Sequence, residues 1–255
     1  MRRLYQRITR VGLVFLALAN LTGCLEWVRA YQTYLQLDEF DRHFAITAQD
    51  GFTLHFKHPK LYSEDFVLLA KLRASNEQPE ADGKLWHYVF RKVDMENRRI
   101  TPEIQFFFDL RFNKLDKISS WTFSPMFLQI APAEFLEASF RSLSGAEINE
   151  EKQQLKAKAE LMEKISAQLP KKAKVVQNLG PPLEITEEEK QEIYYYRFLL
   201  DTQGIEPGYE DRAVSEVRLS FDKSSGELTK MSGRFAGLKI AINYRDYQET
   251  PEPEI

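Results

Sequence analysis

Residues 85–93 read LWHYVFRKV, and residues 193–201 read IYYYRFLLD. In both stretches large apolar side chains alternate with other residues, which is the period-two pattern of a β-strand with one buried face. The alternation assigns six aromatic residues to that face: Trp86, Tyr88, Phe90, Tyr194, Tyr196 and Phe198. We therefore expect two similar strands, 108 positions apart in the chain.

The segments that follow each strand also match. Phe108–Lys114 lies 109 positions before Val217–Lys223, and LDKISS at 115–120 lies 113 positions before LTKMSG at 228–233, once a four-residue turn is allowed for. Any two antiparallel strand pairs share an alternating pattern, but the agreement of order, spacing and side-chain phase favours a duplication. The predicted fold class is α+β: a tandem repeat of a helical segment and an antiparallel β-meander, with the strands packed by helices.

The rest of the chain divides around these strands. Residues 41–131 are predicted to form the first α+β unit, and 132–247 a helical linker followed by the second unit. Within the linker, residues 147–169 are highly charged with apolar residues at helical spacing, which predicts an amphipathic helix. The last residues, 248–255, read QETPEPEI and are predicted to be a disordered tail.

The first 23 residues have the pattern of a secretory signal peptide. Four arginines and no acid precede an uncharged apolar run over 11–21, which is too short to span a bilayer comfortably. The run ends in Leu21-Thr22-Gly23-Cys24, and Cys24 is the only cysteine in the chain. This stretch resembles the lipobox of bacterial lipoproteins, which implies cleavage before Cys24 and acylation of it. Residues 24–40 would then form a lipidated tether helix; the alternatives are an uncleaved anchor or a thiol nucleophile at Cys24.

The same resemblance bears on the compartment. Leu25, rather than an aspartate, follows the cysteine, which implies the periplasmic face of the outer membrane; the inner membrane and the cell surface are the alternatives. Without residues 1–23 the chain keeps 31 basic side chains against 38 acidic ones, a net charge near −7. Such a chain lacks the basic excess of nucleic-acid-binding proteins. The expected partners are the lipid bilayer, through acylated Cys24, and an envelope protein, with no nucleic acid.

A second resemblance concerns the second unit. Leu179-Gly180-Pro181-Pro182 follows a predicted helix and precedes the aromatic strand, and the next strand ends in F-D-x-x-x-G. This order resembles the SmpA/OmlA family, small outer-membrane lipoproteins of the β-barrel assembly machinery. A tandem of such units resembles the β-lactamase inhibitor protein fold, which implies that the two units join in one continuous sheet packed by helices. The first unit departs from the motif, because Leu72-Arg73-Ala74-Ser75 stands in its place. The resemblance implies a protein-binding role in envelope assembly, without catalysis or cofactor.

Motifs of catalysis are absent from the sequence. It contains no GxSxG, HExxH or P-loop pattern. His55 and His58 form an H-x-x-H pair, but zinc sites need three or four ligands, and strand residues three apart point to opposite faces. We therefore expect no catalytic site, no metal and no cofactor. The alternatives to a binding protein are a carrier of lipid or another hydrophobic ligand, and an enzyme acting on an envelope polymer.

The outward face of the same strands remains as a candidate partner-binding surface. It mixes aromatic and aliphatic residues with arginines, a composition typical of interface hot spots. The alternatives are an ordinary solvated sheet face and a face covered by the hairpin predicted over 44–56. The candidate residues are His87, Val89, Arg91, Phe107, Arg111, Tyr195, Arg197, Leu199 and Arg218.

Overall fold

A computed structural model describes residues 22–49, 51–144, 146–149, 154–156, 163–202 and 204–248. Of the predicted signal peptide (1–23), residues 1–21 lie outside these ranges, and so do residues 249–255 of the predicted tail (248–255). Within them, no helix has both the length and the apolar character needed to cross a membrane.

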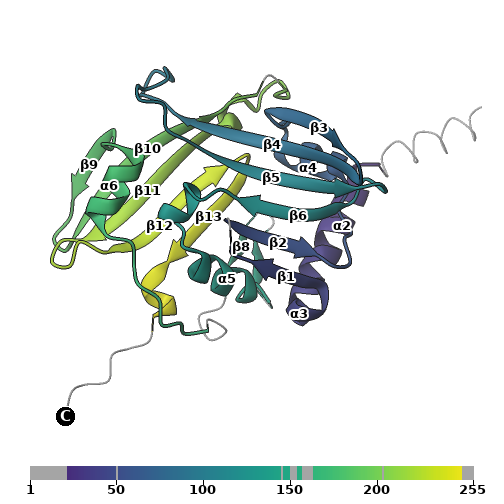
Figure 1. Ribbon diagram of the computed structural model, residues 1–255, viewed down its shortest axis with the longest axis horizontal. Helices are drawn as coiled ribbons and strands as arrows, with labels where there is room; N and C mark the ends of the chain where they lie inside the picture. The colour runs from purple at the N-terminus through teal and green to yellow at the C-terminus, as the bar shows by residue number, and fades with distance from the viewer. Residues whose placement is uncertain are drawn as a thin grey trace, which may run out of the picture.

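The strands form a large antiparallel sheet, which confirms the α+β class (Figure 1). Its path is β1-β2-β6-β5-β4-β10-β11-β12-β13, with β3 beside β4 and β9 beside β10. The strand bounds are β1 Phe44–Thr47, β2 Phe52–Phe56, β3 Asn76–Glu80, β4 Gly83–Lys92, β5 Gln105–Asn113, β6 Ile118–Phe123, β9 Glu184–Glu187, β10 Gln191–Leu200, β11 Val214–Asp222, β12 Leu228–Phe235 and β13 Leu238–Asn243.

The two halves of the sheet share one run of elements, although β1 and β2 precede it in the first half and β13 follows it in the second. A short helix, α4 (Ser63–Ala70) or α6 (Lys172–Leu179), precedes a short strand, a ten-residue strand and the strands of the meander. The halves join where β4 pairs with β10, and three residue pairs make that junction. They are Phe90 with Leu200, Arg91 with Leu199, and Lys92 with Phe198. The sheet is therefore continuous through the two strands that the sequence singles out.

One detail of the predicted internal match is wrong. Ile118 pairs with Phe112 across β5 and β6, and Leu228 pairs with Phe221 across β11 and β12. Ile118 therefore corresponds to Leu228 and not to Met231, so the match of LDKISS with LTKMSG is displaced by three residues. The cause is the length of the turns: the turn between β11 and β12 is one residue longer than the turn between β5 and β6, whereas the predicted match assumed that it is four residues longer.

The sheet curls around an aromatic core. All six aromatic residues predicted to face inward are at most 8% exposed. The ring of Phe235 on β12 lies 5.6 Å from that of Phe106 and 5.8 Å from that of Phe108, both on β5. Because β4, β10 and β11 separate these strands in the sheet, the contact requires a concave inward face. The outward face is therefore convex.

The linker differs from its prediction. Helix α5 (Ala133–Arg141) is present, but β7 (Glu147–Asn149) and β8 (Gln154–Lys156) pair as a small hairpin, and Ile165 makes a strand-like bridge to Gln248. The helix predicted over 147–169 is thus wrong in the part that the structure describes. Residues 165, 167 and 169 are apolar and alternate with polar residues, so an extended chain turns all three toward the core.

The N-terminal segment is docked onto the domain. It contains α2 (Thr22–Leu35), the 3-10 helix η1 (Gln36–Glu39) and α3 (Phe40–His43). Arg29 Nε donates to Oδ2 of Asp65 at 2.7 Å, and the guanidinium also contacts Oδ1 of this fully buried carboxylate. Tyr34 donates its hydroxyl hydrogen to the carbonyl of Ala146 at 2.7 Å. These contacts fix the orientation of α2 relative to the sheet.

Buried tyrosines predict how the fold responds to alkali. Burial raises the pKa of Tyr88, Tyr196 and Tyr244 above the ordinary value of 10.0. Above pH 10 the unfolded chain loses these protons while the folded chain keeps them, so the free energy of unfolding falls as pH rises. We expect cooperative unfolding in this range, with tyrosinate absorbance and circular dichroism changing together. Tyr88→Phe should move the transition to higher pH, and ionisation of all tyrosines without unfolding would contradict the prediction.

Candidate partner-binding face

The nine candidate residues lie on the outward, convex face of β4, β5, β10 and β11. Arg218 is exposed, Val89 is buried, and the other seven are half-buried. The β1–β2 hairpin continues the sheet beyond β6 and does not cover this face (Figure 1). The alternative in which that hairpin covers the face is therefore wrong.

Arg91 is engaged inside the molecule. Its Nε donates to Oδ2 of Asp201 at 2.9 Å, its Nη1 donates to Oε1 of Gln105 at 2.7 Å, and it also contacts the carboxylate of Glu103. Its side chain is only 23% exposed. These contacts join the end of β10 to the start of β5 and leave this guanidinium little capacity for a partner.

Arg197 is held in a similar way. Its Nε donates to Oδ1 of Asn97 and its Nη1 to Oε1 of Glu216, both at 2.9 Å, and its side chain is 19% exposed. Asn97 belongs to the loop between β4 and β5, where it has a positive φ of 62°. Arg197 thus fastens that loop onto the second half of the sheet, which is a structural task.

The first half of the face is likewise satisfied internally. His87 Nδ1 is hydrogen-bonded to Oδ1 of Asp109, and its ring lies 4.9 Å from that of Phe107. Arg111 Nε donates to Oε1 of Glu80 at 3.3 Å. Because opposite charges lie side by side here, this half carries little net charge.

The second half presents exposed cations, of which the sequence predicted Arg218 but not Lys230, Arg234 and Lys239. We define the basic strip as Arg218, Lys230, Arg234 and Lys239, all exposed on β11, β12 and β13. Arg234 lies directly opposite Lys239 in the ladder, and Arg218 lies opposite Ser232. Among the described residues none of the four has an ion-pair partner; the guanidinium of Arg218 lies over the Tyr195 ring at 5.4 Å. The alternation K-x-S-x-R over 230–234 could have indicated this strip.

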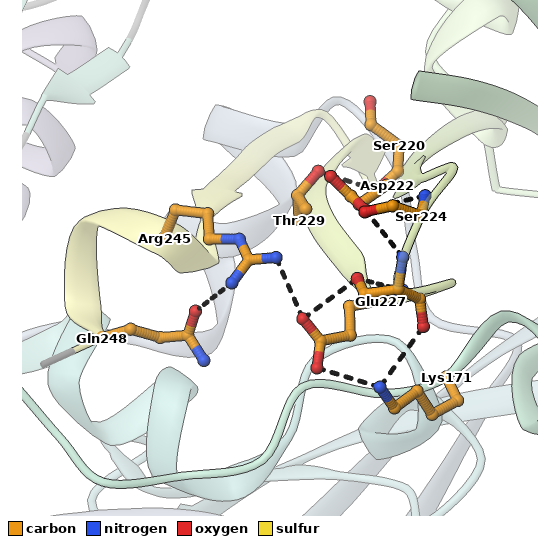
Figure 2. Close-up of polar contacts among 9 residues, drawn as sticks. Lys171, Ser220, Asp222, Ser224, Glu227, Thr229, Arg245 and Gln248 are labelled. Atoms are coloured by element: carbon orange, nitrogen blue, oxygen red, sulfur yellow. Dashed lines mark hydrogen bonds and ion pairs between the residues drawn. The ribbon is translucent and has the colours of Figure 1, made fainter. Parts of the chain in front are cut away.

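Two cations beside Glu227, just before β12, are neutralised, in contrast to those of the basic strip. Glu227 accepts hydrogen bonds from Lys171 and Arg245, each at 2.9 Å (Figure 2). In the adjacent turn, hydrogen bonds from the Ser224 hydroxyl and from backbone amides hold the pKa of Asp222 at about 2. Like charges directly opposite each other destabilise a sheet. The Arg234–Lys239 pair is therefore a local cost that an anionic partner would relieve.

The histidines give no metal centre in the part of the chain described here. His43 and His58 approach to 3.2 Å between their Nδ1 atoms, which the sequence did not predict, while His55 is hydrogen-bonded to Thr47. No group of three or more His, Cys, Asp or Glu side chains that could hold a metal ion occurs within the described ranges.

Comparison with known proteins adds no relative. No protein-family model matches the chain, and no curated protein or solved structure matches it.

Proposed function

We propose that this chain is a lipid-anchored protein of the bacterial envelope that binds another envelope protein and has no catalytic site. Binding takes place on the outward face of β11–β13, and the partner presents an acidic surface. The observation that carries the proposal is the basic strip, whose four exposed cations have no ion-pair partner among the described residues, on a chain that is acidic overall.

The chemistry of the strip suits a protein partner. Complementary charge steers association and selects partners, while arginine and tyrosine supply rigid contact area. Tyr195 and Arg218 lie together at the border of the strip, so they can act as its anchor pair. The convex surface fits a partner that reaches around it, which agrees with binding rather than with enclosing a substrate.

The alternatives have less support. A carrier of lipid or another hydrophobic ligand needs space on the concave side of the sheet. There the rings of Phe106, Phe127 and Phe235 touch one another, at 5.3 to 5.6 Å between centroids. An enzyme acting on an envelope polymer needs a cluster of catalytic groups, and the carboxylates on the outward face are engaged with arginines and a histidine.

We also infer that the two halves arose by duplication of a helix-plus-meander unit. Arg91 pairs with Leu199, its own counterpart 108 positions later, and Phe90 pairs with Leu200, the counterpart of Lys92. This is the register of an isologous contact, in which identical subunits meet about a twofold axis. The register shift at Arg111 and the one at Ser220, 109 positions later, add to this inference.

Charge reversal tests the binding site. In cells, a photocrosslinking residue in place of Ser232 should capture the partner when the rest of the chain is wild type. The same crosslink should be lost in the triple variant Arg218→Glu, Arg234→Glu, Lys239→Glu. The cause is repulsion between the new carboxylates and the acidic partner. The free energy of unfolding, measured by thermal denaturation, should stay within about 1 kcal/mol of the wild-type value, because all three side chains are exposed.

The matched control reverses three other exposed lysines. Lys60→Glu, Lys174→Glu and Lys190→Glu change the net charge equally but lie away from the strip, so capture should persist. Retained capture by the strip variant would refute the proposed site. Crosslinks only to phospholipid or to another anionic polymer would refute the protein partner.

Acylation is tested separately. We expect a palmitate analogue to label the wild-type chain and not the Cys24→Ala variant, because the thioether to the diacylglyceryl group forms at that sulfur. We place the anchored protein at the periplasmic face of the outer membrane, so the labelled chain should fractionate with outer-membrane markers. Label retained by Cys24→Ala would refute lipidation at this residue.

A further inference from the structure

Helix α2 carries an exposed apolar ridge. We define the α2 ridge as Trp27, Val28, Tyr31 and Leu35, whose exposed fractions lie between 46% and 52%. Their spacing of three, four and seven or eight residues places them on one side of a helix. Together with Leu25, this helix holds five of the nine exposed large apolar residues in the described ranges, so the exposure is concentrated and not scattered.

The ridge cannot turn inward without breaking buried contacts. Arg29 is bound to the carboxylate of Asp65, which is fully buried, and Tyr34 is bound to the carbonyl of Ala146. Just beyond the helix, Gln36 is buried and donates to the carbonyl of His58 at 2.9 Å. The side of α2 that carries these contacts faces the domain, so the ridge faces away from it.

The exposed side of the helix is also uncharged. The charged residues of α2 are Glu26, which is 7% exposed, and Arg29, which is paired with Asp65. A contiguous apolar surface without charge marks a contact with another molecule or with a membrane.

The position of Cys24 decides between these occupants. Cys24 belongs to α2 and precedes Trp27 by three residues, a rise of about 5 Å along the helix. The inference rests on the proposed function in one respect, namely that Cys24 is acylated. The acyl chains then hold the bilayer surface within one helical turn of Trp27, the first residue of the ridge. This distance is too short for a protein to lie between the membrane and that end of the ridge.

We propose that the α2 ridge lies in the boundary between the headgroups and acyl chains of the membrane that anchors Cys24. Tryptophan and tyrosine favour this boundary, and an apolar helix face can lie in it without spanning the bilayer. Because α2 is fixed to the domain, the ridge sets the orientation in which the sheet and its basic strip stand above the membrane.

Fluorescence quenching tests the proposal. The full acylated protein is purified from membranes and reconstituted into vesicles of phosphatidylethanolamine and phosphatidylglycerol. One set of vesicles contains lipid with bromine on acyl-chain carbons near the headgroup, and the other set contains no bromine. The chain has three tryptophans, and of these Trp86 is buried and Trp121 lies half-buried on β6. We expect the brominated lipid to remove the emission of Trp27. Trp27→Phe should abolish the bromine-sensitive part, whereas Trp121→Phe, which also removes one indole, should keep it.

The other outcomes are distinct. Protein that floats with the vesicles but shows no bromine-sensitive emission overturns the ridge proposal and leaves the lipid anchor standing. Protein that does not float overturns the anchor and the ridge placement together. A photocrosslinker at Val28 should capture lipid; capture of a second copy or of another protein would overturn the proposal. Val28→Ser with Tyr31→Ser and Leu35→Ser should reduce the quenching and leave the thermal melt unchanged.

Discussion

Replacing Phe235 by alanine should lower the free energy of unfolding by about 4 kcal/mol, which is the usual cost of truncating a fully buried phenylalanine. Phe235 is 1% exposed, and its ring lies 5.3 Å from that of Phe127 and within 6.0 Å of three further phenylalanine rings on β4 and β5. It is the residue of β12 that closes the curl of the sheet. Because a domain of this kind has a total stability of only about 5–15 kcal/mol, the loss is a large fraction of it.

Two further variants keep this result interpretable. Phe235→Leu retains most of the volume and should cost about 1 kcal/mol. Phe107→Ala makes the same deletion on the outward face, where the ring is half-buried, and should cost less than about 2 kcal/mol. The measurement is urea unfolding followed by circular dichroism. Equal losses for Phe235→Ala and Phe107→Ala would show that the concave side is not the main core.

The sequence predicts the faces of these strands well because the signal is local. An inward residue such as Phe108 or Tyr196 is identified by alternation within its own strand, and the structure buries both. The junction between the halves is different, since it depends on three residue pairs between strands about 108 positions apart. Nothing in either strand indicates that Arg91 will pair with Leu199, so the continuous sheet could be expected only from the resemblance.

The errors have related causes. The linker contains both a helical and a period-two pattern. The extended form is favoured because it packs Ile165 and Leu169 against the core, and the Ile165 amide donates to the Tyr247 carbonyl. At the candidate site, the role of a charged residue depends on its ion-pair partner, which the sequence does not show. From the sequence, Arg91 is expected to be an exposed arginine. In the structure it donates to Asp201, which lies 110 positions away in the chain. The unpaired cations of the basic strip stand out only when every acid near them has been assigned to another partner.

The second large effect is expected from substitution of Lys92, because this side chain connects the two halves by binding the end of a helix. It lies on β4, is 2% exposed, and its Nζ donates to the carbonyls of Leu179 and Pro181 at 2.6 Å each. Leu179 is the last residue of α6, and Gly180 between them has a positive φ of 68°, which favours glycine. The Leu-Gly-Pro-Pro motif of the second half is thus capped by a lysine of the first half.

We expect Lys92→Met to lower the free energy of unfolding by about 3 kcal/mol, with a fall in Tm of roughly 10 °C. Methionine keeps the apolar part of the side chain but leaves two carbonyls without their donor, at about 1–3 kcal/mol each. Part of this loss is offset, because burial of the ammonium is itself unfavourable and lowers the pKa of Lys92 to about 8. Thermal and urea unfolding measure the change.

Lys172→Met is the matched control for that variant. Lys172 begins the same helix and pairs with Glu192 at 2.6 Å, but its side chain is 34% exposed, so its loss should cost less than about 1 kcal/mol. If the two methionine variants lose the same stability, the cap on α6 is not what holds the halves together. If Lys92→Met alone is strongly destabilised, one buried cation of the first unit maintains the helix of the second. The halves should then unfold in a single transition, as the continuous sheet requires.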